Sequence, residues 1–212
     1  MHYLGLALYA EGPTDYQFLT PLLPRLCAHL CATESPARVD VGEVVPLNHP
    51  DAVRDRPRDE RIVAAAAMHD GAWNIVFVHA DGAGDPAKAR AEAVQPALDA
   101  LQARFPGAAP GVAVVPVRET EAWLLVDGDA LRSAFGVNLS DSQLGLPNPR
   151  HLAESCIDPK ALLDAAFMAT GPTGLRKRKG TSPMLNALGD QVSLDCLAHL
   201  PSFRRLTDDL RT

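Results

Sequence analysis

The sequence lacks any apolar run that approaches the roughly 18 residues a membrane-spanning helix needs. Its first residues, MHYLGLALYAEG, contain neither a basic leading segment nor a small-residue cleavage site, so we expect no signal peptide. Cysteine is scarce. Cys27 and Cys31 lie four residues apart, but Cys156 and Cys196 do not follow them as a second ligand pair at zinc-finger spacing. We therefore expect a cytoplasmic protein with free thiols, without a membrane segment or a zinc finger.

Positive charge is also in short supply. The chain carries 20 Lys and Arg against 26 Asp and Glu, and this net charge of −6 argues against a general nucleic-acid coat protein. The imbalance is uneven, because residues 1–170 have 13 basic and 22 acidic side chains whereas residues 171–212 have 7 and 4. Hydrophobic residues make up 47% of the chain, which is enough to bury a core and excludes a disordered chain.

Short apolar runs alternate with helical patterns in the first half of the chain. The expected strands are residues 4–10, 39–47, 74–79 and 111–117, and the expected helices between them are residues 14–30, 51–68 and 86–105. This alternation predicts an α/β fold in which helices flank a four-stranded parallel sheet. Pro21 and Pro24 should kink or restart the first helix.

The second half of the chain has a different character. After residue 119 the sequence contains helical patterns and loops but no clear strand pattern. We therefore expect an α/β core over residues 1–127 and a helical C-terminal cap over residues 128–212 that packs on the core.

Acidic residues follow three of the four expected strands. They are Glu11 after the first strand, Asp81 and Asp85 after the third, and Glu119 and Glu121 after the fourth. Ligands of a parallel sheet bind beyond the carboxyl ends of its strands, and a strand order of 2-1-3-4 would make the first and third strands neighbours. Clustered carboxylates repel one another, and a hard divalent cation is their usual partner. For any single acid the alternative is a helix cap or a solvated loop, which we favour for Asp15.

Two motifs at these strand ends stand in the same order as in a known domain. Residues 11–15 (EGPTD) precede a helix, and residues 79–82 (HADG) follow the third strand. They resemble the motifs of the Toprim domain, the catalytic α/β domain of topoisomerases, bacterial primases and the overcoming-lysogenization-defect nucleases. Residues 118–127 (RETEAWLLVD), 159–160 (PK) and 201–203 (PSF) resemble more narrowly a bacterial family of unknown function that is grouped with Toprim proteins.

The Toprim resemblance implies metal-dependent phosphodiester chemistry with a role for each acid. Asp81 would hold Mg²⁺ or Mn²⁺ together with Glu121 or Asp85, and Glu119 adds a further ligand. Glu11 would share the metal or act as the general acid and base.

His79 departs from the Toprim pattern, which has an aspartate at this position. The imidazole would bind the metal, act as an acid or base, or weaken metal binding. Arg118, which adjoins the last group of acids, either contacts the substrate phosphate or serves as a counter-ion.

A basic run near the C-terminus is the best candidate for a nucleic-acid contact. It comprises Arg176, Lys177, Arg178 and Lys179, and it lies in the glycine-flanked segment 171–180 (GPTGLRKRKG). We expect a mobile loop whose charges follow a phosphate backbone, and the alternative is a solvated loop without a partner.

Three functions follow from these motifs. The first is a Toprim-like nuclease that acts on DNA or RNA, works with a partner ATPase as such relatives do, and takes part in phage defence. The second is a degenerate subunit that binds an ATPase or nucleic acid without catalysis. The third is a phosphohydrolase of small molecules, which the negative charge favours. No tyrosine stands at a motif position and no zinc-ribbon cysteines are present, which argues against a topoisomerase and a primase.

Overall fold

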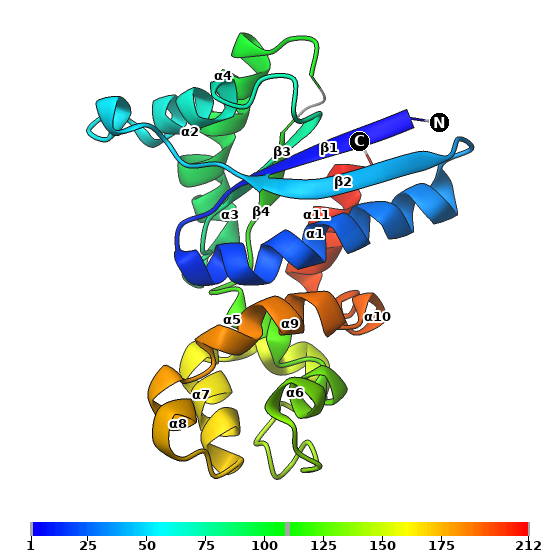
Figure 1. The fold of residues 1–212 in the computed structure, drawn as a ribbon, viewed down its shortest axis with the longest axis vertical. Coiled ribbons are helices and arrows are strands. Elements are labelled where there is room, and N and C mark those ends of the chain that lie inside the picture. The colour runs from blue at the N-terminus through cyan, green and yellow to red at the C-terminus, as the bar shows by residue number, and fades with distance from the viewer. Residues whose placement is uncertain (1, 109–110, 212) are drawn as a thin grey trace.

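The computed structural model, which describes residues 2–108 and 111–211, places four parallel strands in one sheet (Figure 1). The strands are β1 (His2–Tyr9), β2 (Val39–Pro46), β3 (Ile75–His79) and β4 (Val112–Val114). Their order is β2-β1-β3-β4, and every neighbouring pair is parallel. The expected α/β class is therefore confirmed, and β1 and β3 are neighbours whose carboxyl ends meet at one edge of the sheet.

Helices account for most of the remaining chain. Those between the strands are α1 (Pro13–Glu34), the 3-10 turn η1 (Asp51–Val53), α2 (Arg58–Ala67), α3 (Pro86–Ala89), the π-helical turn η2 (Arg90–Val94) and α4 (Gln95–Arg104). Those after β4 are α5 (Glu121–Leu124), α6 (Gly128–Phe135), η3 (Arg150–Ser155), α7 (Pro159–Ala169), α8 (Gly174–Lys179), η4 (Ser182–Met184), α9 (Leu185–Gln191), α10 (Leu194–Leu197) and α11 (Pro201–Leu210). No helix in the described part of the chain is both long and apolar enough to span a membrane.

The alternation of side chains along β1 divides the core into two layers. Leu6 and Leu8 belong to the cluster that includes the apolar face of α1, and Ala7 and Tyr9 belong to the cluster that includes α2 and α4. Helices thus cover both faces of the sheet (Figure 1). Because both faces are covered, ligands reach the sheet at its edges and at its strand ends.

Most helices that follow β4 form a lobe on the far side of α1 from the sheet, with α9 packed against α1 (Figure 1). The contact is close, because a Cβ atom on Gly189 would lie 2.1 Å from the carbonyl oxygen of Phe18. Arg25 of α1 fastens the two helices by donating to the carbonyls of Gly189 and Val192, each at 2.8 Å. The last helix, α11, returns to the sheet and packs against β4.

Proline explains where the helices differ from their expected course. We expected Pro21 and Pro24 to kink or restart the first helix, but α1 continues through both prolines as one helix. Its leucine face stays buried along this course. The single helix expected over residues 51–68 is instead divided into η1 and α2, and Pro57 stands at the N-cap of α2. A π-turn precedes Pro96, whose ring nitrogen has no hydrogen to donate to the helical ladder.

Candidate functional site

Three side chains gather where β1 and β3 end. His79 is the last residue of β3, Asp81 follows two residues later, and Asp15 lies in the first turn of α1. The ring of His79 stands between the two carboxylates, with Nδ1 3.8 Å from Asp15 Oδ2 and Nε2 3.4 Å from Asp81 Oδ1. One ligand atom from each of the three residues lies within 4.8 Å of the others. We call these three residues the Asp-His-Asp cluster.

The Asp-His-Asp cluster contains buried polar atoms without partners. Both ring nitrogens of His79 and the Oδ1 atom of Asp81 are buried and accept or donate no hydrogen bond within the described residues. The side chain of His79 is fully buried. A buried polar group without a partner is costly and is rare in folded proteins. An imidazole and two carboxylates whose ligand atoms lie within 4.8 Å of one another are a donor set that fits a divalent cation.

Asp15 is held in the Asp-His-Asp cluster by two hydrogen bonds. Its Oδ2 atom accepts from the backbone N–H of Gly12 at 3.0 Å, and its Oδ1 atom accepts from the Thr120 hydroxyl at 2.8 Å. The first bond satisfies the backbone N–H of the N-cap residue at the start of α1, so the expected capping role is present. The second bond places the same carboxylate at the site, which the sequence pattern did not indicate.

Glu119 and Glu121 flank Thr120 beside the Asp-His-Asp cluster. Glu121 is buried, and its Oε2 atom lies 3.5 Å from the hydroxyl oxygen of Thr120. Burial raises the pKa of Glu121 above its ordinary value, and the neighbouring carboxylates of Glu119 and Asp15 raise it further against a backbone hydrogen bond that lowers it. The Oε2 atom of Glu119 is also buried without a partner in the described residues. The acids after β4 thus add negative charge beside Asp15.

Gly82 and Gly84 bring the loop after β3 against the segment after β4. A Cβ atom on Gly82 would lie 2.2 Å from the carbonyl oxygen of Pro116, so this approach requires glycine. The backbone N–H of Gly84 donates to the Val117 carbonyl at 2.8 Å. The Arg118 guanidinium packs against Gly84, about 3.5 Å from where a Cβ atom would stand. The loop that carries Asp81 is therefore tied to the segment that carries Arg118 and the two glutamates.

Glu11 lies beside the Asp-His-Asp cluster but points to an arginine. Its Oε1 atom is 3.2 Å from Nη1 of Arg58, and its side chain is 39% exposed. Arg58 also donates to the carbonyls of His79 at 2.6 Å and Ala93 at 3.1 Å. We expected Glu11 to share a metal with Asp81 or to act as the general acid and base, and the structure gives its carboxylate a cationic partner.

Asp85 has a structural role. Its Oδ1 atom accepts from the backbone N–H of Lys88 at 3.0 Å, and it is the N-cap of α3. The structure therefore supports the capping alternative for Asp85 over a metal ligand.

The basic run near the C-terminus forms a helix, not the loop that we expected. Arg176, Lys177, Arg178 and Lys179 all lie in α8, which belongs to the helical lobe (Figure 1). Arg176 donates to the carbonyl of Phe135 and lies 5.4 Å from the centre of the Phe167 ring. One of the four expected phosphate contacts is thus used to hold the lobe together.

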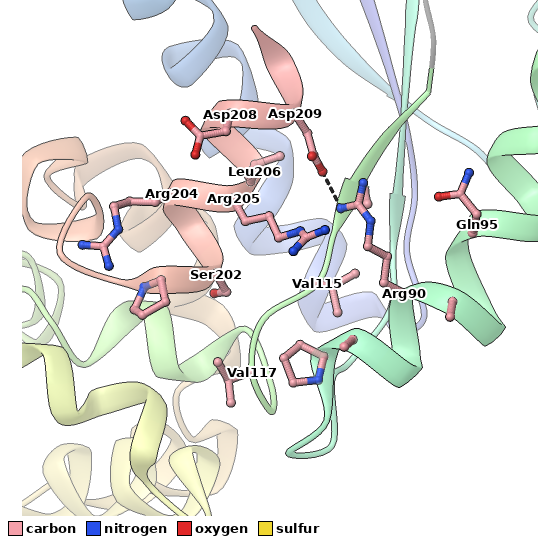
Figure 2. A pocket seen from close by; sticks show the side chains of 15 residues that line it. Arg90, Gln95, Val115, Val117, Ser202, Arg204, Arg205, Leu206, Asp208 and Asp209 are labelled. Atoms are coloured by element: carbon pink, nitrogen blue, oxygen red, sulfur yellow. Dashed lines mark hydrogen bonds and ion pairs between the residues drawn. The ribbon is translucent and has the colours of Figure 1, made fainter. Parts of the chain in front are cut away.

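Two pockets adjoin the sheet. A pocket of about 530 Å³ is lined by Glu11, Gly12 and residues of α2. No residue of the Asp-His-Asp cluster is in its described lining, but Gly12, whose N–H donates to Asp15, connects the two. A larger one of about 780 Å³ lies between α11 and the α3–η2 segment, with β4 at its floor (Figure 2). Arg90 and Asp209 form an ion pair between the two walls of the larger pocket. Its lining, within the described chain, includes no residue of the Asp-His-Asp cluster and neither Glu119 nor Glu121.

The comparisons with known proteins place the chain in a family without assigning it an activity. No curated protein and no solved structure matches it significantly. A family model described as "Domain of unknown function (DUF4276)" matches residues 10–211, which include every residue of the site. Because this match spans nearly the whole sequence, the chain belongs to the DUF4276 family.

Proposed function

We propose that the chain hydrolyses phosphodiester bonds with a divalent cation held by Asp15, His79 and Asp81. The observation that carries the proposal is the buried ring of His79, whose nitrogens lack hydrogen bonds to the described residues and face a carboxylate on each side. The set of one nitrogen and two carboxylates suits Mn²⁺ better than Mg²⁺, because Mg²⁺ prefers oxygen ligands alone. An ion bound there would polarise a water molecule and neutralise charge on a phosphate.

The neighbouring side chains supply the other parts of such a site. Thr120 orients Asp15 through its hydroxyl. Glu121 is suited to proton transfer, because a raised pKa moves a carboxyl group toward neutral pH. Arg58 anchors Glu11 at the border of the smaller pocket, which Arg61 also lines, so a substrate phosphate would meet positive charge there. These residues thus provide orientation, proton transfer and phosphate binding around one point.

The Toprim resemblance adds a substrate class and a setting. The strand order β2-β1-β3-β4 is compatible with that fold, and Glu11 and Asp81 follow the strands at which Toprim proteins carry their acids. We therefore propose a nuclease that acts on DNA or RNA. A partner ATPase and a role in phage defence are further parts of this proposal, and they rest on the resemblance alone.

Two alternatives each have a specific observation in their favour. The pairing of Glu11 with Arg58, together with His79 in place of an aspartate, favours a non-catalytic subunit that binds nucleic acid or an ATPase. The pocket of about 530 Å³ has the size of a small-molecule site, which favours a small phosphorylated substrate. Hydrolysis of bis(p-nitrophenyl) phosphate against p-nitrophenyl phosphate separates diester from monoester chemistry, and absence of both favours the non-catalytic subunit.

Cleavage assays on labelled nucleic acids test the proposal. Single- and double-stranded DNA and RNA are incubated with the wild-type chain in Mn²⁺, in Mg²⁺ and in chelator. We expect cleavage in Mn²⁺ and none in chelator. Asp81→Asn should lower the rate at least about 100-fold, whereas Asp85→Asn, which changes a helix cap outside the cluster, should keep it. Cleavage that persists in chelator, or that Asp81→Asn leaves unchanged, would contradict the proposal.

A further inference from the structure

The smaller pocket is lined by a half-buried arginine, one of whose nitrogens has no hydrogen-bond partner among the described residues. The pocket lies between the end of β1, the start of α1, the segment after β2 and helix α2. Arg61 of α2 lines it, and the Nε atom of Arg61 is buried without a hydrogen-bond partner in the described part of the chain. A buried cationic nitrogen is expected to have an acceptor, because its desolvation is otherwise uncompensated.

Arg58, one helical turn earlier, lines the same pocket, and its guanidinium has partners within the described residues. It donates to two backbone carbonyls and pairs with Glu11 at 3.2 Å, and its guanidinium carbon lies 5.6 Å from the centre of the Tyr9 ring. Residues three apart on a helix share a face, so both arginines border the same pocket. Glu11 is already paired with Arg58, and no described residue accepts from the Nε atom of Arg61, so a bound ligand can supply that acceptor.

The rest of the lining fits more than a bare anion. The Tyr9 hydroxyl lies 3.2 Å from Nδ1 of His49, and the Tyr16 hydroxyl donates to the Leu47 carbonyl at 2.6 Å, so both rings are held in place. Asn48 adds an exposed amide at the rim. Aromatic rings and an amide beside arginine are the groups that proteins use to bind a base together with its phosphate. A pocket of about 530 Å³ has room for both parts.

We propose that this pocket binds one nucleotide, with Arg61 as the counter-ion of its phosphate and with Tyr16 and His49 beside its base and sugar, His49 being held by the buried Tyr9. Glu11 and Gly12 form the wall that the pocket shares with the Asp-His-Asp cluster, and Gly12 donates its N–H to Asp15. A nucleotide here would therefore lie next to the candidate metal centre. The inference rests on the proposed function in one respect, namely that this nucleotide belongs to the nucleic acid to be cleaved.

Calorimetric titration in chelator tests the pocket apart from the metal. AMP, dTMP and inorganic phosphate are titrated into the full chain, into Arg61→Gln and into Arg56→Gln. Arg56 is the matched control, since it is exposed and its recorded ion pair is with Glu60 on the surface. We expect at least one nucleotide to bind at least 10-fold more tightly than phosphate, and Arg61→Gln to weaken it at least 10-fold while Arg56→Gln does not. Nucleotide affinity equal to that of phosphate, no binding, or equal binding by Arg61→Gln would overturn the proposal.

Two further measurements keep the result interpretable. If Arg61→Gln fails to fold, hydrogen exchange of the wild-type chain is measured with and without the nucleotide that binds more tightly. We then expect the nucleotide to protect residues 48–61 from exchange. Protection only in other segments would overturn the proposal. Asp81→Asn should bind the nucleotide in chelator at least as tightly as the wild type. If the chain binds the nucleotide but does not cleave nucleic acid, the proposed function is contradicted and the nucleotide-binding proposal stands. If the chain cleaves nucleic acid but binds no nucleotide, the nucleotide-binding proposal is contradicted and the proposed function stands.

Discussion

The hydroxyl of Thr120 donates to Asp15 Oδ1 at 2.8 Å, although the two residues are 105 positions apart in the chain. The bond joins the segment after β4 to the first turn of α1. Thr120 and Asp15 are both buried, so the bond is shielded from water. It attaches the segment that carries Glu119 and Glu121 to the Asp15 side of the Asp-His-Asp cluster.

Thr120→Val tests this attachment, because valine has a similar shape and no hydroxyl. The substitution leaves a buried carboxylate oxygen without its donor, which should lower the free energy of unfolding by about 1–3 kcal/mol. As Thr120 positions a metal ligand, the affinity for Mn²⁺ should also fall roughly 10-fold. Thr207→Val is the matched control, since that hydroxyl donates within its own helix to the Phe203 carbonyl. If both variants lose stability equally and keep their Mn²⁺ affinity, Thr120 has no positioning role.

Glu121 should make stability depend on pH. Its pKa is raised in the folded chain by burial, so the fold favours the protonated form. Below the ordinary value of 4.5 both the folded and the unfolded chain are protonated and the group costs nothing. As the pH rises through the raised pKa, the folded chain must ionise a buried carboxyl group and loses stability. In chelator, Glu121→Gln should therefore be more stable than the wild type at pH 7, and the difference should vanish below pH 4.5.

Glu34 provides a control of opposite sign. A hydrogen bond from Arg211 lowers the pKa of Glu34, so its ionised form favours the fold. Glu34→Gln should be slightly less stable than the wild type at pH 7, and the loss should be small because both partners are exposed to solvent. Urea unfolding between pH 4 and pH 8 measures both variants. A Glu121→Gln variant less stable than the wild type at pH 7 would mean that the ionised carboxylate is stabilising.

Of the four basic residues of α8, we expect only Arg176 to contribute to stability. Arg176→Gln removes a hydrogen bond to the Phe135 carbonyl and a contact with the Phe167 ring, and it should lower the free energy of unfolding by roughly 1 kcal/mol or more. Replacing Lys177, Arg178 and Lys179 together by glutamine should change it by less than about 0.5 kcal/mol.

The same triple variant tests α8 as a nucleic-acid contact. If these charges contact phosphates, the triple variant should bind single-stranded DNA more weakly than the wild type. The slope of log K against log salt concentration should also become less steep by up to about 3. Fluorescence anisotropy at several salt concentrations measures both quantities. An unchanged affinity and slope would show that α8 is a solvated surface.

The sheet and the place of the site could be predicted because both follow from local patterns. Apolar runs alternate with helical repeats, and parallel strands present their carboxyl ends on one edge, so the residues after β1 and β3 had to lie close together. Asp81 was found in this way, whereas His79 was singled out by its place in the motif that resembles Toprim proteins. The continuous apolar run of β1 likewise predicted a strand buried on both faces, and Ala7 and Leu8 are indeed fully buried on opposite faces of the sheet.

The partners of the site residues could not be predicted, because they come from distant parts of the chain. Nothing near Asp15 in the sequence indicates the bond from Thr120, and nothing near Glu11 indicates Arg58. The segment of α8 was predicted to be a loop, and this error has a similar cause. Glycines on both sides of the basic run are typical of a loop, but Gly180, with φ of 61°, instead follows the end of a short helix. The contacts of Arg176 with the distant residues Phe135 and Phe167 help to hold that helix in the lobe.

The central claim is that Asp15, His79 and Asp81 bind a divalent cation, and thermal unfolding of the wild type and Asp81→Asn in Mn²⁺ and in chelator tests it most directly. Mn²⁺ at 100 times its dissociation constant stabilises a folded chain by about 2.7 kcal/mol, which at this size raises the melting temperature by about 5–10 °C. We expect that rise in the wild type, little or no rise in Asp81→Asn, and a variant at least as stable as the wild type in chelator, where a repulsive charge has been removed. A wild type without a rise in Mn²⁺, together with a variant that melts lower in both conditions, would contradict the account.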